Sequence, residues 1–297
     1  MPGEETKQWY ILSYIPASLT IARKKPEDWI ERFNTQNAAS LQIFAPRFIK
    51  LSEKDKKKSV VPLTFHYVFV KGDLIEVKKL CASGLGFVFV LNKCKQDERY
   101  ATISDEQMLN FKIIASHFSN SLPYYSLENI NLEEGDLVEV IEGDFPGLVG
   151  HYFPKPRSTY GNILLQVSQN LGTVAYNINV KSLRILRFAK NSKRSYDQID
   201  AIVPKLLEAE RKVKSGESLS EKEITDLSLF FRRMESVKLD SSKVEAKLLG
   251  ILLATDRVLG NIFKTESIKK RFDKKIQSVT NPSTLNLLSQ LGVNVLD

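Results

Sequence analysis

The side chains best suited to chemistry in this 297-residue chain are three histidines and two cysteines. His66 lies in a predicted strand, His117 ends a predicted helix, and His151 follows a predicted hairpin. None of them stands at a spacing from cysteines or paired carboxylates that is typical of a metal site or a catalytic triad. We therefore expect no enzyme activity, no metal and no cofactor.

Cys81 and Cys94 are the only cysteines. A chain of this size needs no disulfide, and two thiols without clustered histidines cannot form a structural zinc site. No apolar run approaches eighteen residues, and the start of the chain, residues 1–7, is polar. We therefore expect no signal peptide and no membrane-spanning helix, and a cytoplasmic protein.

Glycines at 143, 147 and 150 are the nearest approach to a phosphate-binding loop. They are not followed by a helix, and the chain has no Gly-Lys-Ser/Thr loop, so they do not indicate a nucleotide site. They instead serve turns between a short strand, residues 137–141, and apolar alternation that restarts at Val149. Phe145 lies at the tip of this turn. The pattern predicts a β-hairpin of a small barrel.

Composition indicates an ordinary globular protein of two or three domains, with 42% hydrophobic and 26% charged residues. The net charge of +8 is uneven: residues 1–124 carry 18 Lys and Arg against 13 Asp and Glu, whereas residues 125–190 carry 6 against 7. A basic N-terminal part fits work near nucleic acid, although modest positive charge also occurs without it.

The first half of the chain alternates predicted strands and helices. Strands are expected at 9–15, 41–49, 63–70 and 86–91, helices at 26–33, 74–80 and 104–117, and a charged loop at 50–58. Pro26 opens the first helix, and Ser104 is placed to cap the last one. This order predicts an α+β sandwich with helices on a sheet.

The second half separates into strands and then helices. Residues 123–131 are polar and read as a linker, and strands are expected at 162–167, 174–178 and 183–186. From Ser195 onward apolar residues recur at helical spacing, with a capping box from Ser220 to Glu223. We predict a bundle of three or four helices that folds by itself.

Two motifs carry a resemblance to a known family. The hairpin from Gly135 to Gly150 resembles the KOW motif of NusG-type transcription elongation factors and some ribosomal proteins. Upstream, Trp9-Tyr10, the segment from Pro62 to Val70, and Ile103-Ser104-Asp105 are similar to the NGN domain of the same family. Phe65-His66 stands where that family usually has Pro-Gly, and the helical extension lies outside the common pattern. With this extension, the chain resembles the UpxY-type paralogues of Bacteroidetes, among which longer forms occur.

The resemblance implies where partners would bind. In this family an apolar NGN pocket takes the tip of the RNA polymerase clamp helices, which places Phe65, Tyr67 and Phe69 in or behind that pocket. For Phe69 a core role is favoured, and for Tyr67 both roles remain open. Arg23, Lys24 and Lys25 would face the upstream or non-template DNA, or form a solvated basic turn.

The same resemblance places Phe145 and Leu171 on a barrel surface that binds Rho or a small-subunit ribosomal protein. Leu171 stands where an aromatic residue is common, which favours a paralogue that does not recruit Rho.

Taken together, the residues predict an NGN sandwich at 7–122, a linker at 123–132, an SH3-like KOW barrel at 133–188 and a helical region at 195–297. The implied function is transcription elongation or antitermination through the polymerase clamp, with surface-polysaccharide operons as implied targets. A ribosome-associated KOW-type RNA-binding protein is the alternative. A nucleic-acid enzyme that docks through these domains is a third class, disfavoured by the absence of catalytic patterns.

Overall fold

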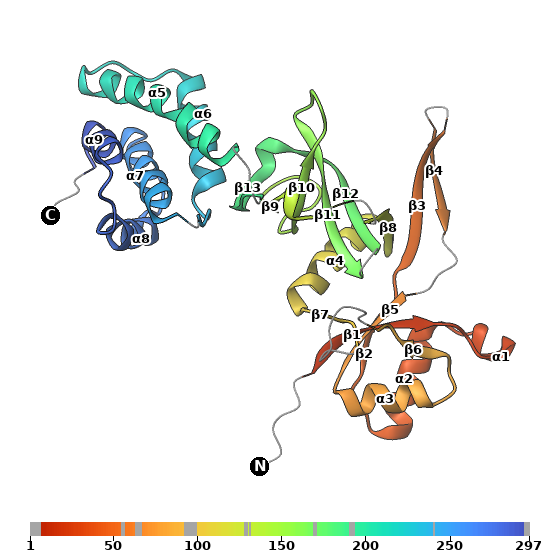
Figure 1. Ribbon diagram of the computed structural model, residues 1–297. Helices are drawn as coiled ribbons and strands as arrows, with labels where there is room; N and C mark the ends of the chain where they lie inside the picture. Colours follow the sequence, from red (N-terminus) through yellow and green to blue (C-terminus); the bar gives the residue numbers. More distant parts are fainter. Residues whose placement is uncertain are drawn as a thin grey trace, which may run out of the picture. The chain divides into compact units, whose positions relative to one another are not determined.

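The protein is a mixed α/β structure in the computed structural model shown in Figure 1. The structure describes residues 7–54, 57–62, 67–91, 100–127, 130, 132–168, 171–189, 194–239 and 241–293. Two compact units are present: residues 1–130 with 162–177, and residues 131–161 with 178–297.

The first unit is built around a five-stranded sheet in which β1 (Gln8–Tyr14) is central. The strand order is β2 (Gln42–Phe44), β5 (Tyr67–Gly72), β1 and β6 (Phe87–Phe89), and β7 (Thr102–Ile103) also pairs with β1. All of these pairings are antiparallel, and in the β1–β5 pair Ile11 lies opposite Phe69. The strand predicted at 9–15 is therefore confirmed.

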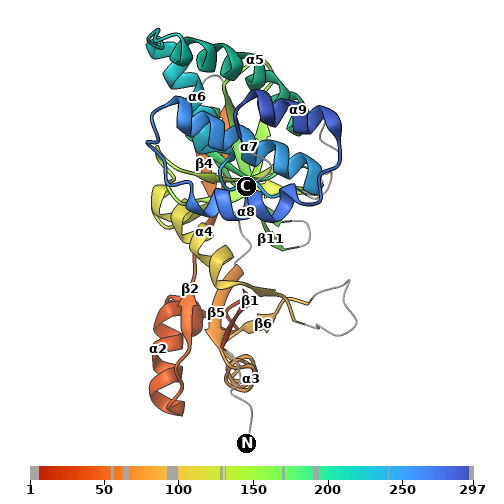
Figure 2. The same cartoon turned by 90° about the vertical axis from the view of Figure 1, so that its left-hand side faces the viewer.

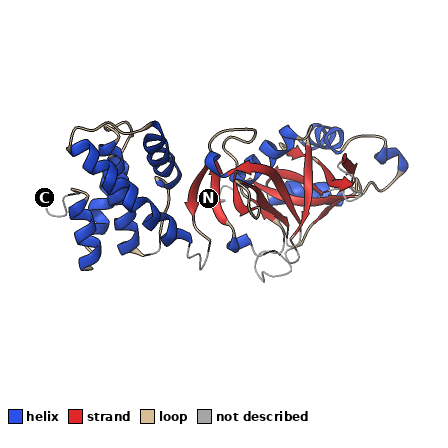
Figure 3. Cartoon of the chain, turned by 90° about the horizontal axis from the view of Figure 1, so that it is seen from above, coloured by secondary structure: helices blue, strands red, loops and turns tan. Residues whose placement is uncertain are grey.

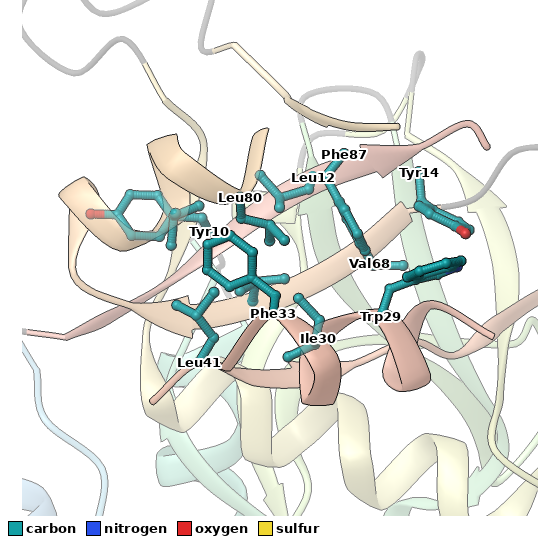
Figure 4. Close-up of a cluster of buried hydrophobic side chains, with 12 residues drawn as sticks. Tyr10, Leu12, Tyr14, Trp29, Ile30, Phe33, Leu41, Val68, Leu80 and Phe87 are labelled. Atoms are coloured by element: carbon teal, nitrogen blue, oxygen red, sulfur yellow. The ribbon is translucent and has the colours of Figure 1, made fainter. Parts of the chain in front are cut away.

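Helices α2 (Pro26–Asn37) and α3 (Leu74–Ala82) cover one face of this sheet (Figure 2). Pro26 is the first residue of α2, which has Glu27 and Asp28 in its first turn, as the sequence predicts. Figure 4 shows the cluster that results, in which alternate residues of β1 meet the apolar face of α2. Its labelled members are Tyr10, Leu12, Tyr14, Trp29, Ile30, Phe33, Leu41, Val68, Leu80 and Phe87.

Three expectations for the first unit were wrong. The strand predicted at 41–49 is two strands, β2 and β3 (Arg47–Lys54), because Pro46 cannot donate a backbone hydrogen bond and breaks the ladder. The charged loop predicted at 50–58 is largely an antiparallel hairpin of β3 and β4 (Lys57–Pro62).

The segment predicted as a linker also begins inside a strand. Strand β8 (Ser121–Ser126) contains Pro123, lies parallel to β3, and pairs with β12 (Leu171–Asn179). The partner strands override the polar composition of this stretch, since backbone pairing does not depend on apolar side chains. A short helix, α1 (Leu19–Ala22), and helix α4 (Asp105–His117) complete the unit.

The second unit contains an antiparallel group of strands: β9 (Asp136–Val140) pairs with both β10 (Val149–Pro154) and β13 (Leu183–Arg187). Short 3-10 helices stand at Leu132–Glu134 and Val180–Ser182. Strands β11 (Tyr160–Ser168) and β12 follow the hairpin in the chain, but their residues 162–177 belong to the first unit. The expected closed SH3-like barrel is not found among the described strands, because β13 has β9 as its one strand neighbour and β12 pairs with β8.

Helices make up the rest of the second unit, as the colouring of Figure 3 shows. The helices are α5 (Arg194–Lys214), α6 (Glu221–Met234), α7 (Ser242–Val258), α8 (Glu266–Ile276) and α9 (Pro282–Gln290). The capping box at Ser220 and Glu223 is present at the start of α6. The described chain thus has five helices here instead of three or four; the short last helix, α9, is capped by Asn281 and begins at Pro282. No helix of the described residues is long and apolar enough to cross a membrane.

Candidate functional site

The second face of the first sheet, opposite α2 and α3, is the candidate site. Side chains alternate between faces along a strand, so Trp9, Ile11 and Ser13 of β1 point away from the cluster formed by Tyr10 and Leu12. In β5, Tyr67 and Phe69 lie on this same face because they pair with Ser13 and Ile11. Helix α4 covers only part of it.

Asp105, the first residue of α4, attaches that helix to the Trp9 end of the sheet. Its Oδ1 accepts hydrogen bonds from Trp9 Nε1 at 2.8 Å and from Lys71 Nζ at 2.7 Å. These contacts, with that of Lys71 the larger, lower the pKa of the Asp105 carboxyl. Lys112 Nζ lies 5.1 Å from the centroid of the Trp9 ring. The N-terminal turns of α4 are therefore fixed over one end of β1.

The opposite end of the face is less covered. Cross-strand pairing places Tyr67, Ser13 and Val88 in one row across β5, β1 and β6. Val88 is 56% exposed, Ser13 and Tyr67 are half-buried, and Ile15, the next outward residue after Ser13, is 69% exposed. We call Ile15, Tyr67 and Val88, together with Ser13, the open row. Apolar and aromatic surface in such a row suits contact with another protein.

Two contacts hold the open row in shape. The Tyr67 ring meets the buried Phe48 ring edge to face, with 6.1 Å between centroids. The Ile15 N–H donates to the Gly86 carbonyl at 2.9 Å. Gly86 has φ +94°, and an added Cβ would collide with the Ile15 carbonyl, so only glycine fits this approach. The exposed Ile15 is thus fixed beside β6.

The predicted basic segment, Arg23 to Lys25, is exposed in the same unit. Lys24 Nζ lies 5.3 Å from the centroid of the Trp29 ring, and the Lys25 N–H donates to Asp28 Oδ2 at 3.1 Å as α2 begins. The charged ends remain open to solvent, where they could neutralise phosphate groups.

The structure separates the predicted site residues. Phe69 is fully buried between Phe44 and Phe111, at centroid distances of 5.9 and 5.6 Å, in agreement with the favoured core role. Tyr67 is half-buried in the open row, and Phe65 lies outside the described residues.

The predicted partner-binding residues of the barrel are core residues. Phe145 is 3% exposed and Leu171 is 6% exposed, so neither offers an apolar surface to a partner. A side chain at the tip of a hairpin is exposed only when no other part of the chain packs on it. The spacing of residues in the sequence does not reveal such packing.

Sequence reasoning missed Ile15 and Val88. The segment 86–91 reads as a uniformly apolar strand, and nothing in its composition tells Val88 from the buried Phe87. The alternation along β1, with Ser13 between Leu12 and Tyr14, was the one signal that an outward face continues there.

Metal-ligating and nucleophilic side chains also occur among the described residues. No group of three or more His, Cys, Asp and Glu side chains among them could hold a metal ion. Burial raises the pKa of the Cys81 thiol to about 11, so at neutral pH it is a protonated and weakly nucleophilic group.

Comparisons with known proteins add little to this geometry. No protein-family model matches the chain, and no curated protein matches it. One solved structure, described as "Domain interaction in Thermotoga maritima NusG", is similar at 16% sequence identity with a TM-score of 0.32. The match covers 60% of this chain and 96% of that chain. Similarity at this level carries no argument about fold or function.

Proposed function

We propose that this protein is a NusG-like transcription elongation or antitermination factor that binds the clamp helices of RNA polymerase through the open row. The observation that carries the proposal is the row Tyr67–Ser13–Val88, an aromatic and aliphatic strip on a rigid sheet that α4 leaves uncovered. We further propose that the protein has no catalytic activity and acts in the cytoplasm.

The chemistry of the strip suits a helical partner. The apolar face of a helix buries its area most readily on a preformed apolar surface, since little side-chain entropy is lost there. Tyr67 has two χ angles and is packed against Phe48, so it is already ordered before binding. Aromatic anchors of this kind carry much of the energy of interfaces.

The basic segment from Arg23 to Lys25 extends the proposal to nucleic acid. These exposed cations belong to the same unit as the open row. They would contact phosphates of the upstream or non-template DNA and so position a strand without reading its sequence. Binding at both places would favour the closed clamp over the paused state and so suppress pausing or termination.

Targets are the least constrained part of the proposal. The similarity of the motifs to UpxY-type factors favours surface-polysaccharide operons, and the burial of Phe145 and Leu171 argues against recruitment of Rho or a ribosomal protein through those two residues.

Affinity purification of the tagged full chain from its host cells tests the proposal. We expect RNA polymerase subunits with the wild type and a strong loss with Val88→Asp, which puts a charge into the open row. Val213→Asp is the matched control, because Val213 is 46% exposed on α5. Ribosomes in place of polymerase would instead support the RNA-binding alternative, and equal polymerase recovery with both variants would remove the open row from the interface.

A further inference from the structure

A second candidate site lies in the other unit, in a cavity between the end of α6 and the strands β9 and β10. Its volume is about 250 Å³, and its polar lining comes from Asp136, Tyr152, Ser158, Thr159 and Arg233. Ligand sites for drug-sized molecules span roughly 300–1,000 Å³, so this cavity suits a smaller molecule.

Arg233, in the last turn of α6, supplies the charge. Its Nε is buried and has no hydrogen-bond partner among the described residues. Burial lowers the pKa of this guanidinium, and the opposing effects of Asp136 and Tyr152 do not compensate. The charged guanidinium of Arg233 therefore has too few negatively charged partners to offset its burial.

Other arginines of the same unit show how unusual this is. Arg257 pairs with Glu210, Arg271 Nη2 lies 2.8 Å from Glu245, and Arg184 Nη2 lies 2.8 Å from Glu235. These partners are carboxylates of the protein itself. Arg233 shares its cavity with a carboxylate, that of Asp136, but forms no such ion pair within the described part of the chain.

Asp136 is itself engaged elsewhere. Its Oδ1 accepts a hydrogen bond from the Ala189 N–H at 2.9 Å, which fixes the carboxylate at the edge of the cavity. The other carboxylate oxygen remains an acceptor. Ser158 Oγ accepts the Tyr160 N–H at 3.1 Å and therefore keeps its own hydroxyl proton to donate.

We propose that this cavity binds a phosphate group that retains a proton, either as inorganic phosphate or as a small phosphate monoester. The guanidinium of Arg233 donates to the phosphate oxygens in the two-pronged geometry that arginine favours. The Ser158 hydroxyl adds a donor, and the P–OH of the ligand donates to Asp136. A fully deprotonated oxyanion could not donate a hydrogen bond to the Asp136 carboxylate.

Isothermal titration of the full chain with sodium phosphate and, separately, sodium sulfate at matched ionic strength tests the proposal. The wild type should bind phosphate saturably and at least about tenfold more tightly than sulfate, because only phosphate can donate to Asp136. Asp136→Asn should reduce that preference, while its amide oxygen still accepts from Ala189. Glycerol 1-phosphate, compared with inorganic phosphate at about pH 5 so that the monoester keeps its P–OH, distinguishes the two sources, since tighter binding than inorganic phosphate supports a monoester.

Arg233→Gln should weaken phosphate binding by about tenfold or more, and Arg232→Gln is the matched control, because Arg232 is the exposed neighbour on the same helix. Circular dichroism verifies that each variant is folded. The phosphate-to-sulfate preference of the wild type tests the proposal even where a variant fails to fold. Absence of saturable phosphate binding by the wild type, or equal binding by folded Arg233→Gln, would overturn the proposal.

Discussion

The two units use antiparallel strands in opposite ways. In the first, α4 covers the Trp9 end of one sheet face and leaves the open row at its other end. In the second, α6 of the same chain packs on β13. One sheet thus leaves apolar side chains exposed at one end of a face, whereas a strand of the other unit is packed against a helix.

The contact between α6 and β13 has both polar and backbone components. Arg184 of β13 pairs with Glu139 of β9 at 3.3 Å and with Glu235, at the end of α6, at 2.8 Å. The Lys238 N–H donates to the Leu186 carbonyl at 3.4 Å. These contacts join the helical region to the strands, and its independent folding stays a prediction.

The largest effect should come from the covered part of the first sheet. Phe69→Ala removes a fully buried ring that contacts Phe44 and Phe111, so we expect a loss of about 3–5 kcal/mol in the free energy of unfolding. Val88→Ala, in the open row, should change it by less than about 0.5 kcal/mol. Urea denaturation of both variants measures the contrast, and similar losses would mean that the two ends of the face are equally covered.

A smaller loss in the free energy of unfolding should follow from removing an ion pair that joins α6 to β13. Glu235→Ala leaves Arg184, whose Nε already lacks a partner, with one carboxylate, and we expect a loss of about 1 kcal/mol. Glu208→Ala is the control, because its pair with Arg211 is exposed and contributes little.

Hydrogen exchange at β13 is the informative measurement for this pair of variants. Faster exchange of β13 in Glu235→Ala alone would support joint unfolding of strand and helix. Unchanged hydrogen exchange of β13 in both variants would indicate that the helical region is a separate domain.

The smallest effect concerns the charges between α5 and α6. Hydrogen bonds from Lys212 and then Ser220 lower the pKa of Glu223 to about 2 from an ordinary value of 4.5. The folded carboxyl holds its proton less tightly than the unfolded one, so its contribution to stability is present above pH 4.5 and is lost as pH falls toward 2.

Lys212→Met should raise the pKa of the Glu223 carboxyl, because it removes the hydrogen bond from Lys212. The pKa should stay below the ordinary value, since the hydrogen bond from Ser220 is kept. The NMR chemical shift of the Glu223 carboxyl, measured against pH in both proteins, gives this pKa. A Glu223 pKa unchanged by the substitution would show that Lys212 does not hold this carboxylate.

Local signals predicted much of the secondary structure from sequence. Pro26 and the Ser104 capping box mark the starts of α2 and α4 because these residues act on the adjacent backbone alone. The hairpin of β3 and β4 and the strand β8 were missed because pairing with distant strands decides them.

The candidate site was only half predicted, for the same reason. Tyr67 was named from its motif, but the exposure of Val88 and Ile15 depends on which other parts of the chain pack on the sheet, and no local pattern encodes that packing. The burial of Phe145 and Leu171 likewise depends on tertiary packing.

The affinity of purified RNA polymerase for the full chain and for Tyr67→Ala tests the central claim most directly. If the open row binds the clamp helices, truncation of this aromatic anchor should weaken binding by about 2 kcal/mol, or roughly thirtyfold in Kd. Tyr67→Phe, which keeps the ring on Phe48, should retain most of the affinity. An unchanged Kd for folded Tyr67→Ala would contradict the account.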